Sequence, residues 1–135
     1  CPEDVVVSEN IEGSGKSKNI NQINENEMIL DIGPKTIFTI KKIINDSNTV
    51  LWNGPAGYFE NPNFQIGTKE ILNAISNKTI NDKIFSVAGG GETVAAINKF
   101  KKSDSFTFVS TAGGAFLEYL EGKTLPGIKA LNQNV

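Results

Sequence analysis

The fold is decided by a stretch in which an apolar strand runs into three consecutive glycines: Lys83-Ile84-Phe85-Ser86-Val87-Ala88-Gly89-Gly90-Gly91-Glu92-Thr93. The residues after the glycines continue as a helix whose apolar stripe reaches Phe100. The same order of strand, bend and helix occurs around Asn53-Gly54-Pro55-Ala56-Gly57 and around Ser110-Thr111-Ala112-Gly113-Gly114-Ala115. Strands that alternate with helices predict an α/β fold, with a parallel sheet that carries helices on both faces in a Rossmann-like arrangement.

The three bends predict a binding surface for a phosphorylated ligand. Glycine lets backbone N–H groups turn outward and places no side chain in the path of an anion. A helix that begins directly after such a bend adds unpaired N–H donors and a partial positive charge. Three such helix ends at one edge of a parallel sheet indicate a nucleotide site.

The remaining elements follow from apolar runs and helix breakers. Residues 4–8 read as a buried parallel strand, and residues 9–27 as a polar surface excursion with a short hairpin near residues 19–23. Thr68 is predicted as an N-cap, Gly122 is placed to end a helix, and Pro126 restarts a short terminal turn or helix. The expected strands are residues 4–8, 28–32, 49–52, 83–88 and 106–109, and the expected helices carry apolar stripes at residues 37–44, 71–75, 93–100 and 116–120.

Length and composition are those of an ordinary globular domain. The chain has 135 residues, 39% of them hydrophobic and 21% charged, which is enough for one domain with a real core. A net charge of −2 argues against a nucleic-acid partner or a basic membrane-binding face. No apolar run approaches the roughly 20 residues of a membrane span. The single cysteine, Cys1, excludes an internal disulfide and is compatible with a cytoplasmic location.

Histidine and arginine are both absent, so all 13 cationic side chains are lysines. General-base catalysis by histidine and bidentate clamping of phosphate by arginine are therefore impossible within this chain. The abundance of Asn, Ile and Lys is also what AT-rich codons produce, and composition does not separate genome bias from a functional reason. Because the chain opens on cysteine with a strand already under way, we expect it to be a piece of a longer protein or a processed one.

One phosphate-binding motif is a false lead. Gly13-Ser14-Gly15-Lys16-Ser17 resembles the end of a P-loop, but Asn10 stands where the first glycine of that motif is needed. The residues that follow have no apolar stripe for a helix. We expect an exposed loop here.

The triple-glycine loop has a functional and a structural interpretation. Three glycines between a strand and a helix are costly to order, and close approach of a ligand would account for them. Glu92 is mildly stabilising in the first turn of any helix, but next to phosphates it calls for a bridging magnesium ion. Thr93 either caps the helix or donates its hydroxyl to a phosphate. Around the first bend, Trp52 to Glu60 form either a tight turn over core aromatics or a nucleoside pocket in which Glu60 accepts ribose hydroxyls.

Taken in order, several stretches resemble phosphoglycerate kinase. The resemblance extends over the whole chain, in register, and corresponds to about the C-terminal third of that two-domain enzyme. The matching stretches are Pro2-x-Asp4-Val5-Val6-Val7, Asp31-Ile32-Gly33-Pro34-Lys35-Thr36, Trp52-Asn53-Gly54-Pro55-Ala56-Gly57-Tyr58-Phe59-Glu60, Gly67-Thr68, Gly89-Gly90-Gly91-Glu92-Thr93, Val109-Ser110-Thr111-Ala112-Gly113-Gly114-Ala115-Phe116-Leu117-Glu118 and Leu120-Glu121-Gly122-Lys123-Thr124-Leu125-Pro126-Gly127.

The resemblance implies that residues 1–135 are the C-terminal portion of a nucleotide-binding α/β domain. The family transfers a phosphoryl group reversibly between 1,3-bisphosphoglycerate and ADP, which gives 3-phosphoglycerate and ATP in glycolysis. Leu30 and Tyr58 would border the adenine, and Asn53, Pro55 and Glu60 would surround the nucleoside. The parent enzyme would be a cytoplasmic, magnesium-dependent monomer that closes about a hinge.

The glycine-rich bends would hold the phosphates. The resemblance implies that Gly90 and Gly91 lie against the nucleotide, that Glu92 faces Mg²⁺ and that Thr93 faces a nucleotide phosphate. Further along the chain, the backbone N–H groups of Gly113 and Gly114 would contact the phosphoryl group in flight, while Ser110 and Thr111 lie in a stretch linked to domain closure.

Two positions depart from the family pattern. Glu92 stands where the family usually has aspartate, which puts metal affinity in question because Mg²⁺ is exacting about geometry. Ala112 replaces the first glycine of the third bend, which is tolerable if its φ is negative.

The larger difference concerns what lies outside these residues. In the family, the basic patch that binds phosphoglycerate and the catalytic arginine belong to an N-terminal domain, and the main nucleotide-contacting lysines precede the position of Cys1. We therefore expect the isolated chain to be inactive. A non-catalytic nucleotide- or phosphate-binding module and a structural remnant that binds nothing are the alternatives.

Overall fold

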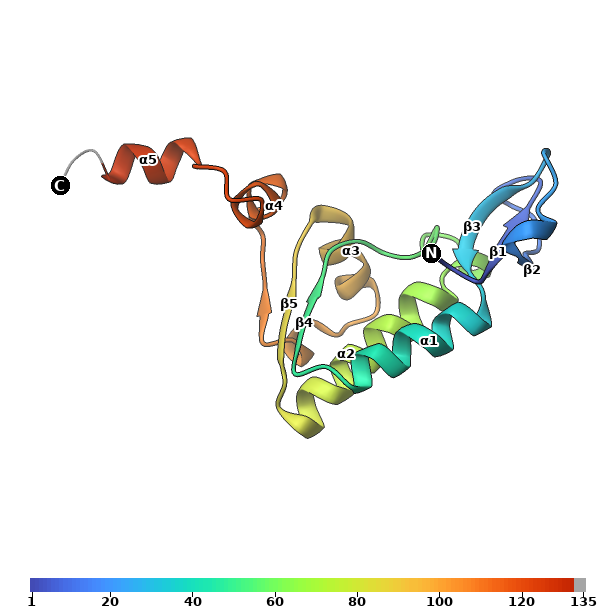
Figure 1. Cartoon of the computed structure of the whole chain (residues 1–135), viewed down its shortest axis with the longest axis horizontal. Helices are drawn as coiled ribbons and strands as arrows, with labels where there is room; N and C mark the ends of the chain where they lie inside the picture. Colours follow the sequence, from blue (N-terminus) through green and yellow to red (C-terminus); the bar gives the residue numbers. More distant parts are fainter. Residues whose placement is uncertain (133–135) are drawn as a thin grey trace.

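The computed structural model describes residues 1–132 of the chain. Its elements form a small antiparallel sheet, a pair of long helices, a parallel sheet with a shorter helix beside it, and two terminal helices, of which the last extends away from the rest (Figure 1). The strands are β1 Asp4–Ser8, β2 Lys16–Asn19, β3 Met28–Ile32, β4 Thr49–Trp52, β5 Phe85–Ala88 and β6 Phe108–Val109. The α-helices are α1 Pro34–Asn45, α2 Ile66–Asp82, α3 Gly91–Lys99, α4 Gly114–Leu120 and α5 Pro126–Asn132, and the short 3-10 turns are η1 Ile20–Gln22, η2 Pro62–Phe64 and η3 Ser103–Ser105.

The first sheet has the order β2-β1-β3, and both of its pairings are antiparallel. The expectation that residues 4–8 form a parallel strand is therefore wrong. Val5 and Val7 are buried as expected, but a continuous apolar run reports burial and not the direction of the neighbouring strand. The strand β2 was not predicted from the sequence, because its residues are polar and it lies at an exposed edge.

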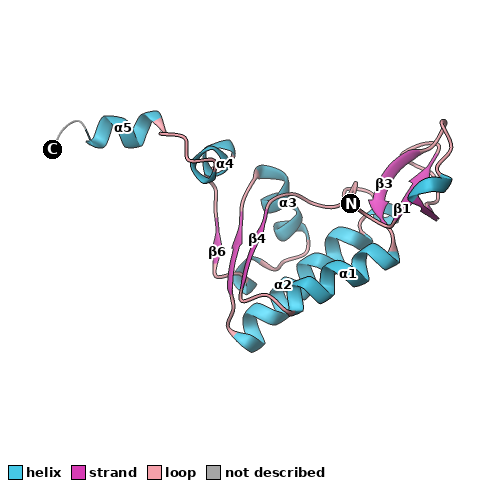
Figure 2. Ribbon diagram, in the orientation of Figure 1, coloured by secondary structure: helices cyan, strands magenta, loops and turns pink. Residues whose placement is uncertain are grey.

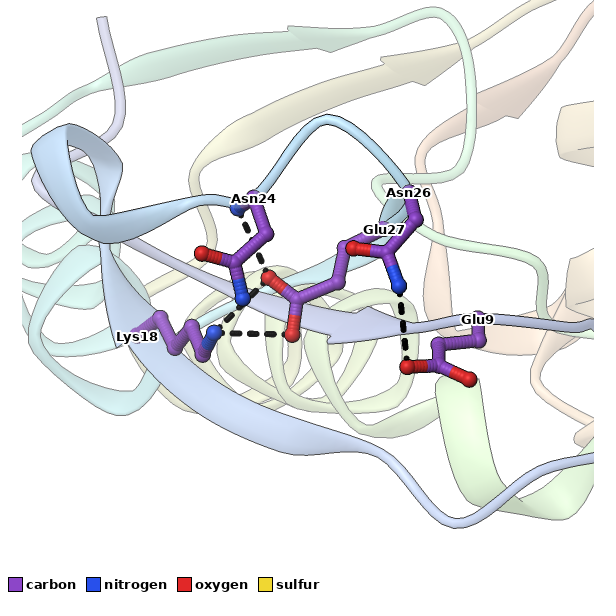
Figure 3. A network of polar contacts seen from close by, with 5 residues as sticks. All are labelled: Glu9, Lys18, Asn24, Asn26 and Glu27. Carbon is purple, nitrogen blue, oxygen red and sulfur yellow. Dashed lines mark hydrogen bonds and ion pairs between the residues drawn. The ribbon is translucent and has the colours of Figure 1, made fainter.

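Polar side chains hold the outer part of this sheet together (Figure 3). Both carboxylate oxygens of Glu27 accept hydrogen bonds from the Lys18 ammonium at 2.7 Å, and one also accepts the backbone N–H of Asn24 at 2.9 Å. Hydrogen bonding to Lys18 and Asn24 lowers the pKa of Glu27. The P-loop-like stretch beside this network is an exposed loop that leads into β2 and not into a helix, as the sequence analysis predicted.

The start of α1 is fixed by an acid from β1. The buried carboxylate of Asp4 accepts hydrogen bonds from the backbone N–H groups of Lys35, at 3.1 Å, and Thr36, at 2.8 Å, and from the Thr36 hydroxyl at 2.8 Å. Pro34 occupies the first helical position, where its missing N–H costs nothing. The helix therefore begins where Gly33-Pro34 predicted, with a cap that comes from another strand.

The second long helix begins two residues earlier than Thr68, so the N-cap prediction for Thr68 is wrong. The carboxylate of Asp31, on β3, accepts the backbone N–H of Gly67 at 2.8 Å and satisfies one of the free donors of α2. Thr68 is fully buried one residue further along. A cap from a distant strand leaves no local sequence signal.

The parallel sheet has the order β4-β5-β6 and confirms the α/β class. Trp52, Ala88 and Phe106 share one apolar core with residues of α1, α2 and α3. On the opposite face, Leu51, Phe85 and Phe108 are 47%, 53% and 57% exposed. Helices were expected on both faces of this sheet. Among residues 1–132, α1, α2 and α3 cover the face that carries Trp52 and Ala88, and the face that carries Leu51 and Phe85 is not covered by a helix (Figure 2). Within these residues no helix is long and apolar enough to cross a membrane.

Candidate functional site

The three glycine-rich bends lie at the same edge of the parallel sheet. Trp52 is paired with Ala88, and Ala88 with Val109, so β4, β5 and β6 end side by side. Hydrogen bonds continue one step beyond the strands: Gly89 N–H donates to the Trp52 carbonyl at 3.0 Å, and Ser110 N–H donates to the Ala88 carbonyl at 2.7 Å. The common edge expected from the sequence is thus present. A helix begins directly after the second and third bends, at Gly91 and Gly114, but not after the first, because α2 starts at Ile66.

The glycines of the second bend, residues 89–91, pack against the first bend and against the helix that follows the third bend. Gly90 has φ +92°, a conformation that favours glycine, and a Cβ there would meet the Asn53 amide oxygen of the first bend. A Cβ on Gly89 would collide with the ring of Phe116, on the helix that follows the third bend. The triple glycine is therefore explained in part by packing against Asn53 and Phe116, which are too far away in the sequence for a local pattern to reveal.

The second and third bends line a common hollow of about 180 Å³. Gly90, Gly91 and Gly113 all contribute to its wall, and the helix α3 begins at Gly91. A Cβ on Gly91 or Gly113 would meet no atom within 4 Å, so open space lies in front of both backbones. The lining residues are Gly90, Gly91, Val94, Ser110, Thr111 and Gly113.

Backbone geometry in the third bend agrees with its sequence. Gly113 has φ +57°, and α4 starts at Gly114. Ala112 is not among the residues with positive φ, so the departure from glycine at that position costs no strain. Its N–H donates to the buried Ser110 hydroxyl at 3.3 Å.

The side chains at the start of α3 differ in exposure. Glu92 is exposed, whereas Thr93 is fully buried. The Thr93 hydroxyl has no hydrogen-bond partner within the described residues, which is unusual for a buried polar group. A Cβ on Gly90 would lie 3.5 Å from this hydroxyl oxygen, so the unpaired group is next to the second bend.

The first bend continues into a loop, residues 54–60, that is anchored to β3 and α2. Tyr58 N–H donates to the carbonyl of Leu30 at 2.8 Å. The N–H groups of Ala56 and Gly57 donate to the buried hydroxyl of Thr68 at 3.1 and 3.3 Å. These bonds bring the predicted adenine neighbours Leu30 and Tyr58 together.

The carboxylate of Asp31 packs against the backbone of the same loop and of α2. A Cβ on either Gly57 or Gly67 would collide with its carboxylate, so both backbones lie directly against it. Burial raises the pKa of Asp31, although hydrogen bonds from Gly67 and Ile32 oppose the shift. An acid inside the apolar run of residues 28–32 is the sequence signal that could have identified it.

The predicted site residues fall into two groups. Tyr58 and Glu60 line a shallow hollow of about 340 Å³ that is separate from the hollow between the second and third bends. Asn53 connects the groups through its contact with Gly90. Pro55 is half-buried in the first bend, and Glu92 and Gly114 are exposed at the starts of α3 and α4 without lining either hollow.

Glu92 is the carboxylate for which the sequence predicted contact with a magnesium ion. Residues 1–132 contain no group of three or more side chains that could coordinate a metal. Mg²⁺ commonly binds through one or two carboxylates together with substrate phosphates and water. Glu92 supplies one exposed carboxylate beside the bends and forms no ion pair with another described residue.

The fold and the site define an α/β protein of the class that binds ligands beyond the carboxyl ends of parallel strands. The sequence profile of phosphoglycerate kinase matches residues 1–123, and the chain belongs to the phosphoglycerate kinase family. It is 47% identical, over 98% of its length, to a phosphoglycerate kinase of Blochmanniella floridana.

Solved structures agree with this membership. The phosphoglycerate kinase of Coxiella burnetii superposes with a TM-score of 0.89 at 44% identity, over 98% of this chain and 34% of that one. The enzyme of Pyrococcus horikoshii OT3 superposes with a TM-score of 0.81 at 33% identity, over 97% of this chain and 32% of that one. The chain therefore spans about a third of the length of the relatives it matches.

Proposed function

We propose that this chain is the C-terminal, nucleotide-binding part of a phosphoglycerate kinase and supplies part of a site for magnesium ADP or ATP. The observation that carries the proposal is the alignment of three glycine-rich bends at one sheet edge, two of which enclose an open hollow. The helix α3 begins at Gly91, in the wall of this hollow, and the free N–H groups of a helix N-terminus favour phosphate.

Each predicted residue has a role in this proposal. Gly90 and Gly91 let the nucleotide phosphates approach the backbone, and the N–H groups of Gly113 and Gly114 stabilise the phosphoryl group as it is transferred. The buried, unpaired hydroxyl of Thr93 would donate to a nucleotide phosphate. Leu30, Tyr58, Asn53, Pro55 and Glu60 form the adenosine side.

The magnesium ion would neutralise phosphate charge, and Glu92 would be its protein ligand in this chain. The carboxylate is free to turn toward the hollow because it has no ion-pair partner among the described residues. The rest of the octahedral shell would come from phosphate oxygens and water.

The parent enzyme would transfer a phosphoryl group between 1,3-bisphosphoglycerate and ADP in the cytoplasm, as a monomer. This chain offers no arginine, and in the proposed parent enzyme the cation that neutralises the acyl phosphate would belong to an N-terminal domain. We therefore expect the isolated chain to bind the nucleotide without turnover.

Calorimetric titration with Mg-ADP tests the proposal. Binding without activity supports a nucleotide-side part of the enzyme, and recovery of ATP formation on adding the complementary polypeptide of a relative distinguishes it from a non-catalytic binding module. If titration with Mg-ADP releases no heat, the chain is a structural remnant that does not bind the nucleotide. Turnover of 1,3-bisphosphoglycerate by the chain alone would refute the expected inactivity.

A further inference from the structure

Lys99, the last residue of α3, directs its ammonium at backbone oxygens. The ammonium donates to the carbonyl of Phe59 at 2.5 Å and to the carbonyl of Glu60 at 3.1 Å. It also lies 5.7 Å from the ring centroid of Phe59 and 5.9 Å from that of Phe100, within the range of cation–π attraction. Four contacts thus hold one cation at the end of the loop of residues 54–60.

This arrangement differs from that of the lysines in ion pairs. Lys18, Lys41, Lys78 and Lys123 each pair with a carboxylate, whereas no carboxylate among residues 1–132 pairs with Lys99. Hydrogen bonds from a charged donor are roughly twice as strong as neutral ones. The charge of Lys99 is therefore used to fix the course of the backbone at residues 59–60.

Lys99 connects the loop of residues 54–60 to the helix that begins at the second bend. The helix α3 starts at the second bend, beside Glu92, and ends at Lys99. Residues 56–58 of the loop are anchored to Leu30 and Thr68, and Lys99 anchors residues 59–60 to α3. A shift of α3 would therefore carry the loop with it.

We propose that Lys99 is a positioning residue that sets the distance between the nucleoside side and the phosphate side of the site. The inference rests on the proposed function, because it assigns adenosine to the loop of residues 54–60 and phosphates to the second bend. Lys99 touches neither group; it acts through the carbonyls of Phe59 and Glu60.

Amide exchange measured by mass spectrometry tests the mechanical part without any ligand. In Lys99→Met, which keeps the apolar stem and removes the charge, exchange in residues 58–61 should rise about tenfold while exchange in β5 is unchanged. Lys41→Met is the matched control, because it removes an exposed pairing with Glu70 on another helix. Unchanged exchange in residues 58–61 of the Lys99 variant would overturn the proposal.

Ligand binding tests the functional part. Lys99→Met should weaken Mg-ADP binding about tenfold and leave the affinity for magnesium pyrophosphate within about twofold, since only ADP needs the nucleoside side. Equal losses for both ligands would indicate general damage and would overturn the positioning role. Lys99→Arg keeps a cation that can donate to both carbonyls and should retain protection and affinity; if it loses both, the proposal fails even where the Met variant does not fold.

The two proposals can fail separately. If the unmodified chain binds neither Mg-ADP nor magnesium pyrophosphate, the proposed function is wrong, and the exchange experiment still decides whether Lys99 anchors the loop. If the chain binds Mg-ADP and both affinity and exchange are indifferent to Lys99→Met, only the positioning role is wrong.

Discussion

Substitution of Gly91 by alanine should weaken ligand binding without destabilising the protein. Gly91 is the first residue of α3 and lines the hollow between the second and third bends. Its φ is not positive, and a Cβ built there meets no atom within 4 Å. The new methyl group therefore fits the protein itself and occupies only space that a ligand would use.

The substitution should affect protein stability and ligand affinity in opposite directions. Alanine is favoured over glycine in helices by up to about 1 kcal/mol, so Gly91→Ala should be as stable as the unmodified chain or more stable. A phosphate that approaches the backbone would meet the methyl group, and overpacking typically costs about 1–3 kcal/mol. Mg-ADP binding should accordingly weaken by roughly five- to 150-fold.

Thermal unfolding and calorimetric titration with Mg-ADP measure the two effects. Gly127→Ala is the matched control, because Gly127 is also a helical glycine with open space at its Cβ, but it lies in α5 away from both hollows. The control should gain stability and bind Mg-ADP normally. If Gly91→Ala binds as tightly as the control, the hollow is not the phosphate site and the proposed function loses its main support.

Three further substitutions test the scaffold and the metal site. Asp4→Asn should destabilise the chain by about 1–3 kcal/mol in urea unfolding, because it weakens the cap on α1. Burial alone would raise the pKa of Asp4, but hydrogen bonds from Thr36 and Lys35 lower the pKa overall. The carboxylate therefore stabilises the fold above about pH 4, and this stabilisation is lost on acidification. The free energy of unfolding of Asp4→Asn should fall less steeply below about pH 4 than that of the unmodified chain, and an equally steep fall would contradict this reasoning. Thr68→Val should cost about 1–3 kcal/mol in the same assay, since two N–H groups lose their acceptor, and a neutral result would show that water replaces the hydroxyl. Glu92→Ala should abolish the magnesium dependence of ADP binding with little change in melting temperature, and a magnesium titration that matches the unmodified chain would exclude Glu92 as a ligand.

Local signals predicted the parallel sheet and its bends well. The expected strand at residues 49–52 coincides with β4, because an apolar run is bounded by a turn on one side and by Asn53-Gly54 on the other. Gly122 has φ +78° just beyond α4, as its position after an apolar stripe indicated. Such features depend on residues that are close in the sequence.

Long-range contacts account for what the sequence did not predict. The direction of β1 depends on its partners β2 and β3, which a run of valines does not specify. The helix α2 starts early because its cap, Asp31, comes from a distant strand. The contacts of Lys99 join residues about 40 positions apart, so no local pattern marks them. The ligand roles of the site residues stay predictions until a nucleotide is bound.

The bare face of the parallel sheet has a consequence for handling the protein. Leu51, Phe85 and Phe108 bring large apolar side chains into contact with water on adjacent strands. Sheets made of parallel strands are normally shielded on both sides. A fully folded sample should therefore brighten a hydrophobic dye such as ANS, a signal ordinarily taken to mean partial unfolding. For this chain, dye fluorescence would report the native surface and should fall, rather than rise, when all three side chains are replaced by threonine.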